Sequence, residues 1–422
     1  MAAGFAGYLE ILGARHAARL LAGTLVGRLP NATAAIAIVL FVRAEGGSYS
    51  LAGALAAVYG VANAVGQPVL GRLVDLYGQP RVQLPAALAA GAAMTVFACT
   101  GTEPPGLAWS AVAAAGLFTP PLEGGLRALW PAVLRREEQL HTAYAMDAVA
   151  QEVMFTVGPL LVTLCVSLWS AQAALVLLNA VGVLGALSVV LSPPSRAWRS
   201  APREAHWLGA LRSPGLLVLL GAFLFVGIAL GSITVAAVPY ADAHGGDAVY
   251  GWLMAALGLG ALAGGAVYGA REWPGAPERR LRVLVALLAV CYVPLTLMPG
   301  VVAMVLLTVV SGVFLAPCIA CAFIIVDRHA PRGTVTEAFS WLVTTFTVGT
   351  SVGTGVAGPV VQSGGALGGF ALPAVAGAVS LLVLLATGPV LAPPGGEAVV
   401  AASSENDPNR AAEPRFSSGD RA

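Results

Sequence analysis

Long, continuous apolar runs constrain the fold of this chain more than any other feature, and the run from Val301 to Val310 is typical. A membrane-spanning helix needs ~20 mostly apolar residues, whereas a strand of a membrane barrel alternates apolar and polar residues. Only 10% of the residues are charged, against ~25% in ordinary soluble proteins. The sequence therefore predicts an all-α membrane protein and excludes a soluble enzyme. With a net charge of +1 and no long basic stretch, we expect no nucleic-acid partner.

Twelve segments are long and apolar enough to cross a bilayer. They are expected at about 20–42, 49–70, 83–100, 107–126, 143–168, 171–191, 214–240, 249–269, 282–298, 301–326, 337–361 and 369–391. Three polar stretches lie between or after them, and the last of these, 392–422, is rich in Ser, Pro, Gly and charge. Such a composition predicts a disordered tail.

The arginines orient the chain in the membrane. If both termini are cytoplasmic, the cytoplasmic loops and termini hold 20 of the 22 basic residues, whereas Arg43 is on the other side and Arg28 lies within the first span. Basic residues near span ends mark the cytoplasmic side. We therefore expect a multi-pass protein of the cytoplasmic membrane with both termini inside.

The two halves of the chain look duplicated across a basic linker at 192–213. Four glycines of the second span recur in the eighth at an offset of 198, and Gly116-x-Phe118-x-x-Pro121 recurs at an offset of 196. Gly158-Pro159 is echoed by Gly358-Pro359. The predicted organisation is a six-helix bundle at 1–191, the cytoplasmic linker, and a pseudo-symmetric bundle at 214–391. Secondary transporters use such repeats and bind substrate between them near the membrane midplane.

The loop after the second span reads Gly-Arg-Leu-Val-Asp-Leu-Tyr-Gly-Gln-Pro-Arg over 71–81. It resembles the signature loop of the major facilitator superfamily, G-x-x-x-D-R-x-G-R-R, at Gly71, Asp75, Gly78 and Arg81. The resemblance implies the family's fold of twelve helices and a loop that acts as a latch between the halves. The Arg that usually follows the Asp is replaced by Leu76.

Other motifs of the family are incomplete here. The second-half copy of the signature loop has no Asp at the matching place, so any latch of this kind rests on Asp75. The antiporter motif of the fifth helix is reduced to Gly158-Pro159, with Met154 where an earlier Gly stands, and this weakens a proton-antiport interpretation. The kinks that Gly and Pro permit still suit a transporter that bends or rocks.

Polar groups deep in the spans are the candidates for function, because an ionisable side chain there costs ~2.5–3.5 kcal/mol on insertion scales. Arg28 and Glu152 lie at similar depths in the first and fifth spans, and we expect them to pair. The pair either lines the central cavity and couples protons through Glu152, or locks the bundle permanently. Further cavity candidates are Asn31, Gln151, Asn63 and Gln67, and the last two alternatively join helices.

Glu123 and Arg127 stand four residues apart and predict a structural pair at the inner rim. No catalytic constellation, cofactor motif or metal-ligand spacing is visible, so we expect no enzyme activity, no cofactor and no metal. The sequence predicts a monomeric secondary transporter that exports a small, fairly apolar organic molecule against protons. A uniporter or an importer of a metabolite with the same fold is the first alternative, and a membrane enzyme or receptor is the second.

Overall fold

The computed structural model describes residues 2–134, 136–202, 206–271 and 273–391. The tail predicted at 392–422 and part of the linker lie outside the described residues. Helices make up the described chain almost entirely. Those of the first half are α1 (Ala2–Gly13), α2 (Ala17–Ala44), α3 (Tyr49–Tyr77), α4 (Gln79–Thr100), α5 (Pro105–Leu117), α6 (Leu122–Val133), α7 (Glu137–Leu168) and α8 (Ala171–Val190).

A linker with two short helices leads to the second half. The linker helices are α9 (Pro193–Ala197) and η1 (Gly209–Arg212). The second half contains α10 (Pro214–His244), α11 (Asp247–Gly269), α12 (Pro277–Tyr292), η2 (Val293–Leu297), α13 (Val301–Gly312), α14 (Leu315–His329) and α15 (Val335–Ala386).

These helices account for the twelve predicted spans, although only ten helical segments of the described chain are long and apolar enough to cross a membrane. The fourth span is divided into α5 and α6 at Pro120 and Pro121, because proline cannot continue the hydrogen bonding of a helix. The eleventh and twelfth spans form the single element α15, which turns sharply at Gly365. Gly365 has a φ of 62°, a backbone conformation that glycine adopts without strain.

The internal duplication is visible in the way the helices break and pack. The fourth span breaks after Leu117 and the tenth after Gly312, within the repeated Gly-x-Phe-x-x-Pro motif. A Cβ at Gly116 would run into the carbonyl of Tyr59 on α3, and one at Gly312 would run into that of Leu257 on α11. Tyr59 and Leu257 are themselves related by the offset of 198. The repeated glycines therefore mark one helix–helix contact made twice, which confirms the prediction of two pseudo-symmetric bundles.

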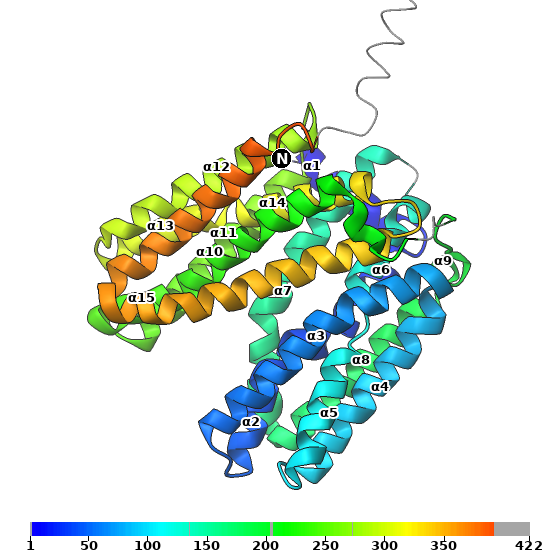
Figure 1. Ribbon diagram of the computed structural model, residues 1–422, viewed down its shortest axis with the longest axis horizontal. Helices are drawn as coiled ribbons and strands as arrows, with labels where there is room; N and C mark the ends of the chain where they lie inside the picture. Colours follow the sequence, from blue (N-terminus) through cyan, green and yellow to red (C-terminus); the bar gives the residue numbers. More distant parts are fainter. Residues whose placement is uncertain (1, 135, 203–205, 272, 392–422) are drawn as a thin grey trace, which may run out of the picture.

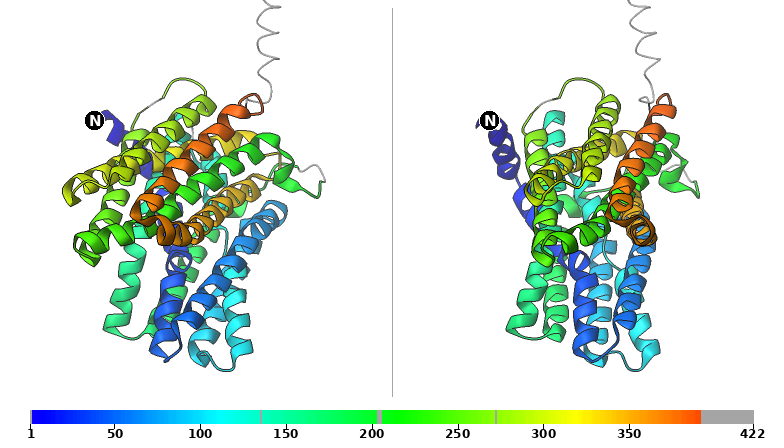
Figure 2. Two further views of the ribbon diagram at one scale, coloured as in Figure 1. Left: turned by 60° about the vertical axis from the view of Figure 1, so that its left-hand side comes forward. Right: turned by 90° about the vertical axis from the view of Figure 1, so that its left-hand side faces the viewer.

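The two bundles meet at one end and diverge from it, as the paths of α3 and α15 show (Figure 1). The first bundle lies below the second in both turned views (Figure 2). Helices α3 and α6 contact α15 across the interface, and α7 contacts α11 and α14. We call the end where the halves touch the closed end. It carries Asp75 and Arg127 of the first half and Gly269 and Thr336 of the second.

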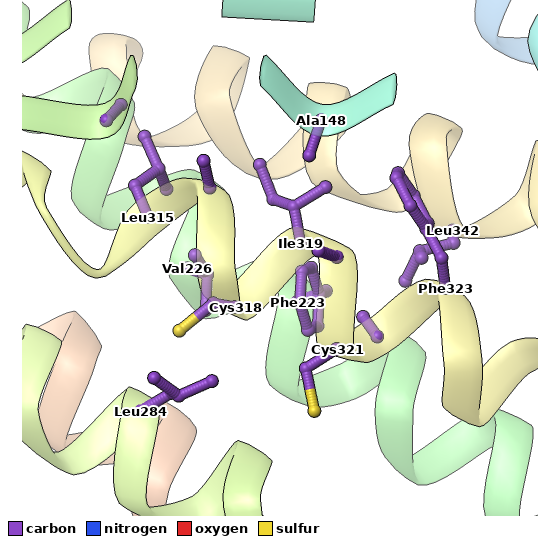
Figure 3. Close-up of a cluster of buried hydrophobic side chains, with 14 of the residues drawn as sticks. Ala148, Phe223, Val226, Leu284, Leu315, Cys318, Ile319, Cys321, Phe323 and Leu342 are labelled. Atoms are coloured by element: carbon purple, nitrogen blue, oxygen red, sulfur yellow. The ribbon is translucent and has the colours of Figure 1, made fainter. Parts of the chain in front are cut away.

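Helix α14 is buried along nearly its whole length and packs against α11 and α12 of its own half and α7 of the first half. Cys318 and Cys321 are fully buried there with Phe323, and Figure 3 shows both cysteines among apolar side chains. In the same view Ala148, from α7 of the first half, faces α14 near Ile319 (Figure 3). The core of the second bundle thus extends to a helix of the first, and this contact holds the halves together at the closed end.

Candidate functional site

Asp75 joins the two halves at the closed end. It lies in the last turn of α3, because the helix continues past the predicted end of the span and ends only at Gly78. The side chain is buried, with 7% of its surface exposed. Its two oxygens accept hydrogen bonds from the backbone N–H groups of Thr336, at 3.1 Å, and Glu337, at 2.9 Å. The carboxylate therefore caps the start of α15, where the helix dipole favours a negative charge.

Other positions of the signature loop connect to neighbouring elements. Gly71 lies against α15, since a Cβ there would meet the Ser340 hydroxyl at 2.7 Å. Gly78 has a φ of 87° and separates α3 from α4. Arg72 donates a 2.8 Å hydrogen bond to the carbonyl of Trp207 in the linker, whereas Arg81 is exposed. The loop thus contacts both the other half and the segment that connects the halves.

A ring of four charged side chains lies inside the first bundle, next to the closed end. Arg28 bonds to Glu123 at 2.8 Å and to Asp147 at 3.2 Å, while Arg127 bonds to Asp147 at 2.6 Å and to Glu123 at 3.4 Å. All four side chains are at most 13% exposed. Each arginine contacts both carboxylates, so the ring is electrically neutral and its charges are compensated without water. This mutual compensation lowers the cost of burying charge within a membrane bundle.

Arg127 also contacts the second half. Its guanidinium carbon lies 3.7 Å from the centre of the Phe323 ring on α14 and 5.8 Å from that of Phe339 on α15. A guanidinium over an aromatic face at this distance is stabilised by cation–π attraction. Gln151 approaches the same guanidinium, with 3.5 Å between its Oε1 and Nη2. Arg127 therefore connects the charge ring to the interface between the halves.

The structure corrects the predicted pairing of Arg28. The sequence places Glu152 opposite Arg28, whereas the structure gives Arg28 the partners Glu123 and Asp147. Asp147 and Glu152 are five residues apart on α7, which turns the side chain by ~140° and moves it ~7.5 Å along the axis. Glu152 is half-buried and lies on a different face of α7 from Asp147.

The remaining polar candidates Asn31, Asn63 and Gln67 make hydrogen bonds between helices. Asn63 donates to Asn31 at 3.1 Å and so joins α3 to α2, both residues being partly buried. Gln67 is buried and donates to the carbonyl of Thr119 at 2.9 Å, at the break between α5 and α6. These bonds connect helices of one bundle.

The two Gly-Pro pairs differ in their surroundings. Gly158 packs against α2, where a Cβ would lie 3.2 Å from the Thr33 methyl. A Cβ added at Gly358 would enter open space, with none of the described atoms of other elements within 4 Å, and Pro359 is exposed. Both prolines lie inside their helices, Pro159 in α7 and Pro359 in α15, and each removes one backbone hydrogen-bond donor there. Gly158 therefore makes a close contact with another described helix, and Gly358 makes none with the described residues.

Comparison with known proteins identifies the family. The profile described as "Major Facilitator Superfamily" matches residues 20–305, and no curated protein matches the sequence. The human organic anion transporter MFSD10 (TETRAN) has a similar structure, with a TM-score of 0.66, 16% identity, and coverage of 87% of this chain and 98% of that one. A bacterial homologue of the iron transporter ferroportin in an outward-facing state has a TM-score of 0.68, 15% identity, and coverage of 88% and 98%.

The E. coli fucose:proton symporter FucP is similar to the same degree. Its TM-score is 0.65 at 16% identity, with coverage of 87% of this chain and 97% of that chain. At such identities the likeness shows the fold alone. The family itself follows from the profile, which spans more than half of the chain. This protein belongs to the major facilitator superfamily of membrane transporters.

Proposed function

We propose that this chain exports a small, fairly apolar organic molecule across the cytoplasmic membrane by alternating access, in exchange for protons. The observation that carries the proposal is the contact of Asp75 with the start of α15. It joins the halves at one end through two hydrogen bonds, and both bonds must break when the halves rock apart. The unit that transports is a single chain, because one chain supplies both halves of the path.

The closed end is the cytoplasmic end in this proposal. It carries Arg72, Arg81, Arg136 and Arg280, and arginines near span ends favour the cytoplasm. Both termini are then cytoplasmic, and the described conformation is closed to the cytoplasm and faces outward. The charge ring and Arg127 form part of the cytoplasmic closure.

Protons couple to transport through Glu152 in this proposal. The residue is half-buried near the middle of α7, a helix that packs against α11 and α14 of the second half. Rocking of the halves changes the surroundings of this carboxylate, and burial and nearby charges decide whether a carboxyl group binds a proton. The members of the neutral charge ring, Arg28 and Asp147 among them, pair with one another inside the first bundle.

The composition of the second bundle supports the proposed substrate class. Its ionisable side chains are found near helix ends, as Glu278, Arg280, Asp327 and Glu337 illustrate, while its spans carry Ser, Thr and aromatic residues at mid-length. A wall of this kind suits a weakly polar organic molecule. A polyanion needs several arginines directed into the path, and the two deepest arginines are already paired with carboxylates.

Transport in everted membrane vesicles tests the proposal. A panel of fluorescent lipophilic dyes is added with an imposed pH gradient, acidic inside the vesicle, and we expect uptake of at least one dye that collapses when the gradient is dissipated. Glu152→Gln removes the titratable group and should abolish gradient-driven uptake while downhill flux of the same dye persists. Glu45→Gln, at an exposed position between α2 and α3, is the matched control and should behave like the unchanged protein.

Other outcomes select the alternatives. Downhill flux that ignores the gradient in both the unchanged protein and Glu152→Gln indicates a uniporter. Uptake by right-side-out vesicles, with none by everted vesicles, indicates an importer. Both results reject proton-coupled export, and the absence of flux for every dye in the panel rejects the apolar substrate class.

A further inference from the structure

The end of α11 is held by side chains from the other half of the molecule. The last carbonyls of a helix have no partner within it. Three of the last four carbonyls of α11 accept hydrogen bonds from side chains of the first half: Ala266 from the Tyr8 hydroxyl, Tyr268 from His141 Nε2 and Gly269 from the Thr142 hydroxyl, each at 3.0 Å. The Ala266 carbonyl also accepts the backbone N–H of Ala270. Because a carbonyl only accepts, Nε2 of His141 carries the proton in this contact. Donors are also favoured here by the negative end of the helix dipole.

Close packing surrounds these hydrogen bonds. A Cβ at Gly269 would collide with the Tyr8 hydroxyl, and it would also lie near the Cβ of Ala145. The imidazole of His141 lies 4.6 Å from the Tyr268 ring, measured between centroids. Glycine at position 269 therefore lets α1 and α7 approach α11 closely enough to reach its carbonyls.

This contact is the pseudo-symmetric counterpart of the one made by Asp75. Gly71 and Gly269 are equivalent at the offset of 198, and each packs against the opposite half. Near Gly71, the Asp75 carboxylate accepts hydrogen bonds from the start of α15. Near Gly269, the end of α11 accepts hydrogen bonds from side chains of the first half. Trp273 stands where Asp75 would recur, and its indole instead donates to the carbonyl of Tyr268 at 2.9 Å. The side chain is therefore the hydrogen-bond acceptor in the first contact, and the side chains are the donors in the second.

We propose that Tyr8, His141 and Thr142 form a second latch, which acts with Asp75 to hold the closed end shut, and that α1 is a strap across this end. The proposal rests on the alternating-access cycle proposed above. Helix α1 precedes the first span, yet its Tyr8 bonds to the second half and its Glu10 accepts from Gln139 of α7 at 3.0 Å. It must release α11 when the closed end opens.

Tyr8 is a constant donor in this latch. Burial raises the pKa of its hydroxyl to about 12, so the group stays protonated over the physiological range. Net hydrogen bonds of this kind shift an equilibrium by about two- to twelvefold each. Removing Tyr8 and Thr142 as donors should therefore move the balance between outward- and inward-facing states by about four- to 140-fold.

Hydrogen–deuterium exchange of the full chain in nanodiscs tests the latch without a substrate. The variants are Tyr8→Phe, Thr142→Val and the two together. We expect faster exchange at the start of α7, the end of α11 and the start of α15, with slower exchange at the opposite end, around the turn between α10 and α11. Thr142→Ser keeps the hydroxyl and should restore the original pattern.

Two control variants keep the side-chain change but lie outside the latch. Tyr77→Phe alters an exposed tyrosine of α3, and Thr95→Val alters a hydroxyl that bonds within its own helix, to Gly91 at 2.8 Å. Neither should produce opposed changes at the two ends.

The outcome also separates the latch from the proposed transport cycle. Faster exchange confined to the end of α11, or faster exchange at both ends, shows only local or general loosening and overturns the second latch. If Asp75→Asn gives opposed changes while the Tyr8 and Thr142 variants do not, the second latch is wrong and alternating access stands. If no variant gives opposed changes, both proposals fail.

Discussion

The buried charge ring leads to the sharpest prediction about stability. Arg127→Met removes one cation and leaves Glu123 and Asp147 to share Arg28, so the site carries a net negative charge. Its members are at most 13% exposed, and Asp147 is fully buried. Breaking a buried ion pair by removing one partner costs ~3–5 kcal/mol, so we expect a loss of that size. Asp147→Asn should cost a similar amount, because it leaves a net positive charge.

The double variant Arg127→Met/Asp147→Asn distinguishes a coupled ring from two separate pairs. It restores neutrality, since Arg28 and Glu123 remain paired at 2.8 Å. We therefore expect the double variant to be more stable than the sum of the single changes predicts, with a coupling energy of about 2–3 kcal/mol. The double variant should still be less stable than the unchanged protein, because the contact of Arg127 with Phe323 is lost as well. A desolvated cation–π contact contributes ~2 kcal/mol.

Thermal unfolding in detergent, followed by tryptophan fluorescence, measures these differences. A loss of 3–5 kcal/mol corresponds to a fall of the midpoint on the order of 10 °C for a bundle of this size. Arg19→Met is the control, because Arg19 is exposed and donates a hydrogen bond to the carbonyl of Ser188 at the surface of the bundle; its midpoint should change little. Strict additivity of the two single changes would refute the ring as a coupled unit.

Two further predictions concern the contacts of the helices. Asp75→Asn keeps one acceptor oxygen and loses the charge at the start of α15, so it should weaken the closed end by ~1.5–3 kcal/mol; faster labelling of a cysteine placed at Ser340 checks this, and unchanged labelling would count against it. Gly264→Leu pushes a side chain into the carbonyl of Val313 and should lower the melting midpoint, since overpacking costs ~1–3 kcal/mol. Gly358→Leu enters open space and is its control; equal effects of the two glycine changes would contradict the packing argument.

Much of the fold could be predicted because lipid imposes rules that are local in the sequence. A spanning segment must satisfy its own backbone hydrogen bonds, so long apolar runs become helices. The repeated glycines and prolines then mark where those helices break and touch, as Gly116 and Gly312 do at equivalent positions. The end of α3 was harder to predict, because a helix continues into polar sequence until a residue such as Gly78 stops it.

The functional site was predicted less completely, and Arg28 shows why. Sequence reasoning can place ionisable residues at similar depths, and Asp147 stands five residues before Glu152 in the same span. It cannot tell which of Asp147 and Glu152 faces Arg28, since that depends on the rotation of α7 about its axis. The contact of Arg127 with Phe323 had no signal in the sequence, because the two residues are nearly two hundred positions apart and belong to different halves.

The sequence by itself determined the class of structure, the number of spans and the duplication, because hydropathy and the residues that break helices act over short distances. The tertiary structure alone decided which groups meet across the halves: Asp75 with the start of α15, and Tyr8, His141 and Thr142 with the end of α11. A helix end exposes the same backbone groups whatever its sequence. Its partner is therefore set by how the bundles pack, and only the folded arrangement brings that partner within hydrogen-bonding distance.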